Sequence, residues 1–362
     1  MSASSQPGPQ EHPFAPFVRI LGKGKSGSRS LSRAEAREAF SMILEGRVEP
    51  VQLGAFLMLL RVKEETGEEL AGFVEACRAA MSPPPPGLQV DLDWSCYAGK
   101  KHQHPWFILA VLLLTQAGYR VFIHGAAGHT PGRLYTEDAL GQLGLPVGSS
   151  WSEVTAQLDE CNFSYLPLRR FCQPLDELIQ LRPLLGLRSP VNTLTRMLNP
   201  LRAPCSIQSI FHPAYAALHQ DADRALGQPR ALVFKGDSGE VEIKPQADTR
   251  LHLLAGRQAQ ELVMPRALAT RAVPVDQPGV APLRDLWSGE CEDRYAREAV
   301  LATAAAALLL LQPGLELPAA RQQADLLWRE RDTTRLPGSD LHPADDAPHA
   351  ACAAGPDPAR PS

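Results

Sequence analysis

Two adjacent lysines, Lys100 and Lys101, follow a short apolar stretch that ends near Trp94. The polar loop that holds them continues to His104, and Pro105 then opens a strongly apolar run with the composition of a buried helix. A loop between a strand and a helix faces the helix N-terminus, where unpaired backbone N–H groups and the helix dipole attract anions. We therefore expect this loop to bind phosphate groups, which belong either to a small cosubstrate or to a polymer.

Two further side chains of this loop fit that chemistry. Tyr97 carries a ring on which a nucleobase can stack, although a loop tyrosine can equally be packed in a core. His102 lies beside the lysines and forms a His-x-His pair with His104. A metal site needs at least a third ligand, and the nearby sequence supplies none, so we predict no metal there. The lysines could instead be a solvated pair, but their place at a helix N-terminus favours phosphate binding.

Other basic residues occur in segments that could face the same cleft. A Gly-rich segment near the N-terminus holds Lys23 and Lys25, and such short basic runs also occur as solvated surface. Arg133 and the pair Arg169–Arg170 follow predicted strands. The predicted nucleic-acid-binding or phosphate-binding residues are Lys23, Lys25, Tyr97, Lys100, Lys101, His102, Arg133, Arg169 and Arg170.

The order of elements indicates how these loops are positioned. A strand, a loop, a helix and a second strand between residues 91 and 145 form one βαβ unit. Upstream, Ser32 and Glu35 form a capping-box pattern that starts a helix, and two more amphipathic helices follow up to Met81. Further strands are predicted at residues 163–167, 206–211 and 231–235, and helices at 136–143, 152–158, 214–224, 294–311 and 319–330.

These elements predict an α/β protein in which a small helical bundle precedes a larger α/β domain. Residues 175–201 are expected to be mostly helical and to join the bundle. The predicted boundaries are 1–13 for a flexible leader, 14–82 for the bundle, 83–87 for a proline linker, 88–332 for the α/β domain and 333–362 for a disordered tail.

Composition limits the class of protein. At 362 residues the chain can form two domains with substantial cores, and its net charge of −4 argues against a wholly cationic surface without excluding local basic patches. Its seven scattered cysteines, with no Cys-x-x-Cys pair, are typical of a reducing compartment. The longest apolar runs, 106–114 and 299–311, are too short to span a bilayer, and no apolar signal segment is present. We expect a cytoplasmic protein without a membrane partner, and nucleoid association is compatible with this.

Three motifs lie at the ends of predicted elements. His124-Gly125 follows the second strand, residues 181–188 lead to Asn199-Pro200, and residues 236–242 combine glycines with acidic residues. Together they resemble the anthranilate phosphoribosyltransferase and nucleoside phosphorylase group (glycosyltransferase family 3) over residues 15–330. The resemblance implies a small N-terminal helical bundle domain and a larger α/β domain of the nucleoside phosphorylase or phosphoribosyltransferase type. The family-equivalent positions are His124, Gly125, Arg182, Arg188 and Glu240, of which the two arginines match residues that contact the aromatic acid in the enzymes.

The sequence departs from the enzymes at three points of their active site. The glycine-rich loop that cradles phosphoribosyl pyrophosphate is residues 97–102 here, with one glycine left, although close backbone approach to a pyrophosphate needs residues without a Cβ. A Lys-His-Gly-Asn motif keeps only its His and Gly, so we interpret His124 as structural rather than as a base. An Asp-Glu metal motif becomes Gly239-Glu240, which removes one oxygen ligand for magnesium. We predict no catalytic residue, metal or cofactor, and magnesium would be needed only by a transferase.

Two more motifs resemble the YbiB-type branch of TrpD-like proteins. They are Phe-Cys-x-Pro-Leu at 171–175 and Ser-x-x-His-Pro-x-Tyr at 209–215. This resemblance implies a homodimer that binds DNA or RNA largely independently of sequence. The apolar faces of the bundle also exceed what its short helices can bury among themselves, which favours a dimer. Two alternatives stay open: a glycosyl- or phosphoribosyltransferase that uses phosphoribosyl pyrophosphate, with a metal on Glu240 and Glu242, and a scaffold that binds another protein.

Overall fold

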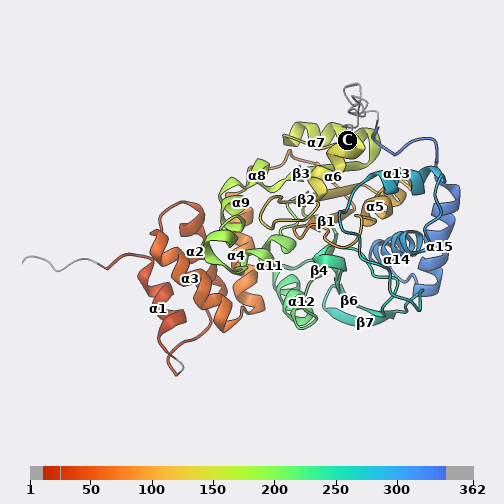
Figure 1. Cartoon of the computed structure of the whole chain (residues 1–362). Helices are drawn as coiled ribbons and strands as arrows, with labels where there is room; N and C mark the ends of the chain where they lie inside the picture. Colours follow the sequence, from red (N-terminus) through yellow and green to blue (C-terminus); the bar gives the residue numbers. More distant parts are fainter. Residues whose placement is uncertain (1–10, 25, 340–362) are drawn as a thin grey trace, which may run out of the picture.

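A seven-stranded mixed sheet forms the centre of the larger part of the chain (Figure 1). The computed structural model describes residues 11–24 and 26–339. The strands are β1 Leu92–Cys96, β2 Val121–Gly125, β3 Phe163–Pro167, β4 Cys205–Ile210, β5 Arg230–Lys235, β6 Thr249–Ala255 and β7 Gln258–Met264. Their order is β3-β2-β1-β4-β5-β6-β7. The first five are parallel, β6 pairs antiparallel with β5, and β7 pairs antiparallel with β6.

Helices surround this sheet and form the N-terminal bundle. The bundle helices are α1 Ala15–Gly22, α2 Arg33–Leu44, α3 Pro50–Lys63 and α4 Gly67–Ala80. The remaining α-helices are α5 Phe107–Gln116, α6 Thr136–Leu143, α7 Trp151–Cys161, α8 Leu168–Phe171, α9 Gln173–Ile179, α10 Arg182–Leu185, α11 Val191–Leu194, α12 Tyr215–Leu226, α13 Ala281–Ser288, α14 Arg294–Leu311 and α15 Leu317–Glu330. Two 3-10 helices are η1 Thr195–Met197 and η2 Asp237–Gly239. The predicted fold class, a small helical bundle with a larger α/β domain, is confirmed.

Local sequence signals begin several of these elements. The predicted capping box is confirmed, because Ser32 Oγ accepts from the Glu35 N–H at 3.3 Å and the Glu35 carboxylate accepts from the Ser32 N–H at 2.8 Å. Strand β3 and helices α6 and α14 occupy the predicted residues. Helix α14 is buried on nearly all sides, as its alanine- and leucine-rich composition requires.

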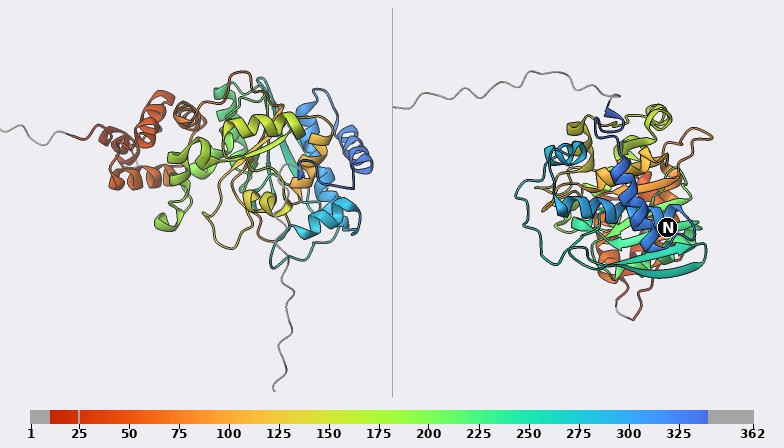
Figure 2. Two further views of the ribbon diagram at one scale, coloured as in Figure 1. Left: turned by 90° about the horizontal axis from the view of Figure 1, so that it is seen from above. Right: turned by 90° about the vertical axis from the view of Figure 1, so that its right-hand side faces the viewer.

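Apolar helices cover both faces of the sheet. Helices α5, α14 and α15 lie on one face, around a core that includes Trp94, Ile207 and Leu232. The opposite face, which carries Phe122, shares its core with the bundle and with α9 and α11. Although the bundle projects to one side (Figure 2), its core is therefore continuous with that of the sheet domain. No helix among the described residues is long and apolar enough to cross a membrane.

The strand order reverses between β1 and β4. Strand β1 has β2 and then β3 on one side, whereas the chain returns through β4 and β5 on the other side. In such sheets ligands bind outside the carboxyl ends of the strands at the reversal. The segments that leave these ends are residues 97–104 after β1, 211–214 after β4 and 236–248 after β5.

Three parts of the chain differ from the prediction. Residues 175–201 are mostly helical but are divided into α9, α10, α11 and η1, with Gly186 in a left-handed conformation (φ 71°) ending α10. The hairpin β6–β7 was not predicted, because most of β7 is exposed and lacks an apolar face. The predicted tail begins too early, since Leu336 is buried and Trp287 Nε1 donates to the Arg335 carbonyl at 2.9 Å. The rest of that tail and leader residues 1–10 lie outside the described residues.

Buried hydrogen bonds connect the sheet to the bundle side. Ser206 Oγ donates to Asp93 Oδ2 at 3.1 Å, and Gln208 Nε2 donates to the two carboxylate oxygens of Asp223 at 3.0 and 3.2 Å. Asp223 lies on α12, which packs against α4 of the bundle. Burial raises the pKa of Asp223 to about 7, in spite of the Gln208 hydrogen bond.

The raised pKa of Asp223 predicts a pH-dependent stability. In the folded protein Asp223 keeps its proton up to about pH 7, whereas the unfolded chain loses it near pH 3.8, so its contribution to stability falls as pH rises through this window. We expect Asp223→Asn to gain stability relative to wild type between pH 4 and pH 8, by at most about 4 kcal/mol. Urea denaturation of both proteins at several pH values measures this difference. A difference that stays constant with pH would contradict the assignment.

Candidate anion-binding site

Lys100 points into the protein rather than toward solvent. Its ammonium group forms salt bridges with Asp237 and Glu242, and the residue is 0% exposed. Its backbone also pairs with that of Leu134 in an isolated antiparallel bridge. The prediction that Lys100 binds phosphate is therefore wrong, because two internal carboxylates neutralise its charge.

The pKa values of the three groups reflect this pairing. Burial opposes the charge of Lys100, but Glu242 and Asp237 outweigh it and raise the pKa of the ammonium. Burial likewise opposes ionisation of Asp237, yet Lys100 lowers the pKa of that carboxyl. Burial raises the pKa of Glu242 to about 7 even beside Lys100. As pH falls, Glu242 is therefore the first of the two carboxylates to take up a proton.

Glu240 occupies the backbone donors of the loop after β1. Its Oε1 accepts hydrogen bonds from the Ala98 N–H, at 2.7 Å, and from the Gly99 N–H. Such N–H groups are what a loop at a helix N-terminus offers to a phosphate. Burial raises the pKa of Glu240, and its Oε2 has no hydrogen-bond partner among the described residues. An internal carboxylate thus takes the place of an external anion.

Tyr97 and His124 are also part of the interior. The Tyr97 hydroxyl lies 2.7 Å from His124 Nδ1, and His124 Nε2 lies 3.1 Å from Asp93 Oδ1. The prediction that Tyr97 stacks on a base is wrong, because its ring is buried. Gly125 permits the close packing of β1 and β2, since a Cβ there would lie 2.1 Å from the Cys96 carbonyl oxygen.

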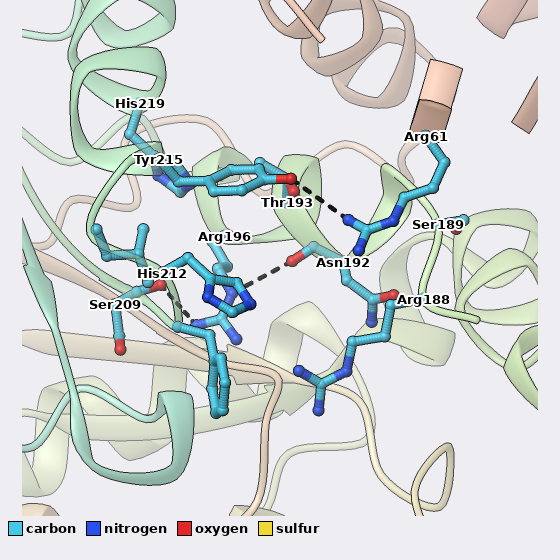
Figure 3. Close-up of a pocket in the computed structure, with 12 residues that line it drawn as sticks. Arg61, Arg188, Ser189, Asn192, Thr193, Arg196, Ser209, His212, Tyr215 and His219 are labelled. Atoms are coloured by element: carbon cyan, nitrogen blue, oxygen red, sulfur yellow. Dashed lines mark hydrogen bonds between the residues drawn. The ribbon is translucent and has the colours of Figure 1, made fainter. Parts of the chain in front are cut away.

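An open hollow lies between Arg61 of the bundle and the carboxyl end of β4 (Figure 3). Arg61 from α3, Arg188 and Arg196 line it, and we call it the arginine hollow. Arg61 Nη1 donates to the Tyr215 hydroxyl at 3.3 Å, and Arg196 Nη1 donates to the Ser209 carbonyl at 2.8 Å. Of the 12 residues that line the hollow in the described part of the chain, none is acidic.

The arginines in and around this hollow repel one another. Burial, together with the charges of Arg133, Arg182 and Arg196, lowers the pKa of Arg188 to about 10. Within residues 11–24 and 26–339, neither these four arginines nor Arg61 forms a salt bridge with a carboxylate. The buried Nε of Arg188 also lacks a hydrogen-bond partner in this part of the chain. Guanidinium groups without a salt bridge are the side chains that bind phosphate and carboxylate anions most readily in proteins.

Arg133 binds the loop after β1, residues 97–104, which we call the closed loop because Lys100 and Glu240 fix it internally. Its Nη1 donates to the carbonyl groups of Ala98, Gly99 and Ser238 at 3.0, 2.8 and 3.0 Å. Arg182 donates to the Thr130 hydroxyl. Arg133 therefore holds the loop in place while its charge adds to the positive potential at Arg188.

Aromatic side chains form another wall of the arginine hollow. Phe211, directly after β4, is 46% exposed. The Arg188 guanidinium carbon lies 5.9 Å from the centroid of this ring, and the His212 ring packs edge-on against it at 5.0 Å. The hollow therefore combines cations with an accessible aromatic surface.

A second basic hollow lies next to the first. Lys235, Lys244, Arg250 and Arg271 line it, and we call it the outer hollow. Ile210 lines both hollows, and Pro213 also lines the outer hollow, so both hollows border the segment that follows β4. Lys244 pairs with Asp237 at 3.1 Å and Arg250 with Glu261 at 3.1 Å. Asp248 also lines the outer hollow, and Lys235 and Arg271 are its cations without a salt bridge among the described residues.

The other predicted residues do not line the arginine hollow. Lys23, Lys101 and His102 are exposed elsewhere on loops. Arg169 lies on α8, not in a loop, and pairs with Glu137, while its exposed neighbour Arg170 also lies on α8. Their role in binding phosphate stays a prediction, and Lys25 lies outside the described residues.

Sequence reasoning missed several residues of the two hollows. Arg61 ends an amphipathic helix, where a solvated arginine is ordinary, and the sequence gives no sign that it faces β4. Phe211 looked like the last residue of a strand, although it lies just beyond β4 and its ring is exposed. A usable signal was His-Pro at 212–213, since a proline directly after a strand marks a turn at the carboxyl end of the sheet.

Comparison with known proteins agrees with this geometry. Residues 17–81 match the helical bundle domain of a glycosyl transferase family, and residues 108–327 match the α/β domain of that family. The chain belongs to this glycosyl transferase family. It is 31% identical over 323 residues to the anthranilate phosphoribosyltransferase of Methylocella silvestris, which covers 83% of this chain and 89% of that protein.

Two other relatives complete the comparison. The chain is 29% identical over 245 residues to the uncharacterized protein YbiB of Escherichia coli, covering 67% of this chain and 76% of YbiB. The crystal structure of anthranilate phosphoribosyltransferase (TrpD) from Thermus thermophilus matches with a TM-score of 0.69 and 25% identity, covering 86% of this chain and 97% of the enzyme. The predicted family resemblance is confirmed.

The residues present do not fit the magnesium ion that the Asp-Glu motif of the enzymes implies. The Lys100 ammonium stands between Asp237 and Glu242, and Glu240 binds backbone N–H groups. A cation added to this cluster would have to displace the lysine or face it at close range. Among the described residues, no group of three or more His, Cys, Asp or Glu side chains is placed to hold a metal.

The buried ion pairs predict a large effect of removing Lys100. Lys100→Met leaves Glu242 buried without its cation, and breaking a buried pair in this way costs about 3–5 kcal/mol. Because protonated Glu242 needs no cation, the loss of stability should be larger at pH 8 than at pH 6. Urea denaturation at both pH values measures it.

The neighbouring exposed lysine provides the matched control for this experiment. Lys101→Met should leave the free energy of unfolding within about 0.5 kcal/mol of wild type. Adding Glu242→Gln to Lys100→Met should restore part of the stability. If Lys100→Met were as stable as Lys101→Met, the ion pairs would not hold the loop.

Proposed function

We propose that this protein binds DNA or RNA in the cytoplasm, largely independently of sequence, and lacks anthranilate phosphoribosyltransferase activity. The observation that carries the proposal is the group of arginines in the arginine hollow that have no carboxylate partner among the described residues. Arginine binds phosphate oxygens through a planar set of donors, and this charge needs an anion for compensation. The mild net charge of −4 does not oppose this, because the cations are concentrated at one place.

Two features favour a polymer over a small phosphorylated substrate. The outer hollow adds the cations Lys235 and Arg271 beside the same segment after β4 that borders the arginine hollow. Meanwhile Glu240 and Lys100 fill the loop and the carboxylates on which phosphoribosyl pyrophosphate and its metal would depend. We therefore propose a nucleic-acid backbone as the ligand and neither metal nor cofactor as a requirement.

Removing one arginine should make the affinity for nucleic acid lower and less dependent on salt, because one phosphate contact is lost. We expect Arg188→Ala and Arg61→Ala each to reduce the slope of log affinity against log salt concentration by about 0.7–0.9, the value of one phosphate contact. Fluorescence anisotropy with a labelled oligonucleotide at several salt concentrations measures the slope. Arg257→Ala is the matched control, because Arg257 is exposed in the β6–β7 turn at the opposite end of the sheet and should leave the slope unchanged.

The same titration separates the proposal from its alternative. Affinity that is indifferent to salt and to both arginines would overturn nucleic-acid binding. Displacement of the oligonucleotide by micromolar phosphoribosyl pyrophosphate, only with magnesium present, would instead support an active transferase.

We also propose that the protein is a homodimer joined through its bundle. Helix α3 has an apolar stripe of Val51, Ala55, Met58 and Val62, which repeats every three or four residues on one side of the helix. Val51 is 78% and Val62 85% exposed in the single chain. The small Ala55 allows a partner helix to approach closely. An exposed apolar stripe of this kind is typical of a subunit interface.

The stripe predicts a change of oligomeric state. Two charges placed on it, Val51→Glu with Val62→Glu, should convert a dimer to a folded monomer, because both side chains are exposed in the single chain and the burial of unpaired carboxylates in an interface is costly. Light scattering coupled to size-exclusion chromatography measures the mass, and circular dichroism checks the fold. Leu326→Glu on α15, a half-exposed leucine outside the bundle, is the control and should stay dimeric. A wild-type monomer would overturn the proposal.

A further inference from the structure

We infer that the arginine hollow holds one unpaired nucleobase on the ring of Phe211, so that the preferred ligand is single-stranded nucleic acid. This inference rests on the proposed function and adds the class of nucleic acid to it. It starts from an aromatic ring that is 46% exposed among cations instead of packed in the core. Phe211 is the one aromatic residue among the exposed large apolar side chains of the described residues.

The surroundings of Phe211 are those of a stacking site. The edge-on His212 ring, at 5.0 Å, supports the phenylalanine from one side without covering it. The Arg188 guanidinium lies 5.9 Å from the ring centroid, where it can stack on the same base or bind its phosphate. Asn192 and Thr193 also line the hollow and offer polar groups to the edge of a base. Every base has an aromatic face, so this arrangement is tolerant of sequence.

The positions of the two hollows fit a strand that passes over Phe211. Both hollows border the segment after β4, in which Phe211 lies. Phosphates that flank the stacked base would therefore meet Arg188 in the arginine hollow and Lys235 in the outer hollow. The bases of a duplex are already stacked and paired, so a duplex can offer phosphates to these cations but no free base to the ring.

The experiment compares four oligonucleotides of equal length: a single strand, the matching duplex, an abasic strand and a strand with one 2-aminopurine. The proteins are wild type, Phe211→Leu, Phe211→Tyr and the surface control Leu326→Ala, and anisotropy at one salt concentration gives the affinities. We expect Phe211→Leu to weaken binding of the normal single strand about tenfold and binding of the abasic strand little. Phe211→Tyr, which keeps the ring, and Leu326→Ala should both bind as wild type does. Stacking should also quench 2-aminopurine with wild type and not with Phe211→Leu.

The outcomes separate this inference from the proposed function. If wild type binds the normal, abasic and duplex ligands equally, nucleic-acid binding stands and the base site is overturned. If Phe211→Leu weakens the normal and abasic strands to the same degree, the residue acts through structure and the base site is also overturned. If wild type binds none of the ligands, both proposals fail. A loss confined to strands that carry bases supports the base site.

Discussion

The burial of Lys100 between Asp237 and Glu242 is the constraint on which the rest of the site depends. A lone ammonium in the interior is too costly to keep, so the lysine requires both carboxylates and fixes the loop after β1 against the segment after β5. Glu240, in the same segment, then reaches the Ala98 and Gly99 N–H groups. One ion-pair cluster thus fixes the path of the loop and allows Glu240 to accept its backbone N–H hydrogen bonds.

The closed loop contains two neighbouring cations with different environments. Lys100 and Lys101 are neighbours, yet one is buried and paired and the other is exposed. Pairing, rather than the number of basic residues, decides which positions can attract an external anion. By this criterion the binding surface that we propose lies at Arg61 and Arg188, which form no salt bridge among the described residues. It does not lie in the loop that looks most basic in the sequence.

Much of the fold follows from local signals, whereas much of the site does not. The capping box at Ser32 and the apolar run of α14 identify their helices because the deciding contacts lie within a few residues. The direction of the Lys100 side chain depends on Asp237 and Glu242, which are 137 and 142 residues away along the chain. No local pattern contains that information. The sequence therefore places Lys100 in the loop at the carboxyl edge of the sheet, but it does not reveal that this side chain points inward.

Arg133 contacts the loop after β1 and also contributes positive charge near the arginine hollow. Its guanidinium donates to three carbonyl groups, of Ala98, Gly99 and Ser238, and so holds the closed loop against η2. Carbonyl oxygens satisfy its hydrogen bonds but carry no net charge, so its positive charge still acts on Arg188. The Glu240 carboxylate accepts from the Ala98 and Gly99 N–H groups and forms no salt bridge with Arg133 or Arg188 among the described residues. The hydrogen bonds that hold the loop therefore supply no salt bridge to the neighbouring guanidinium groups, which is why we propose an external anion there.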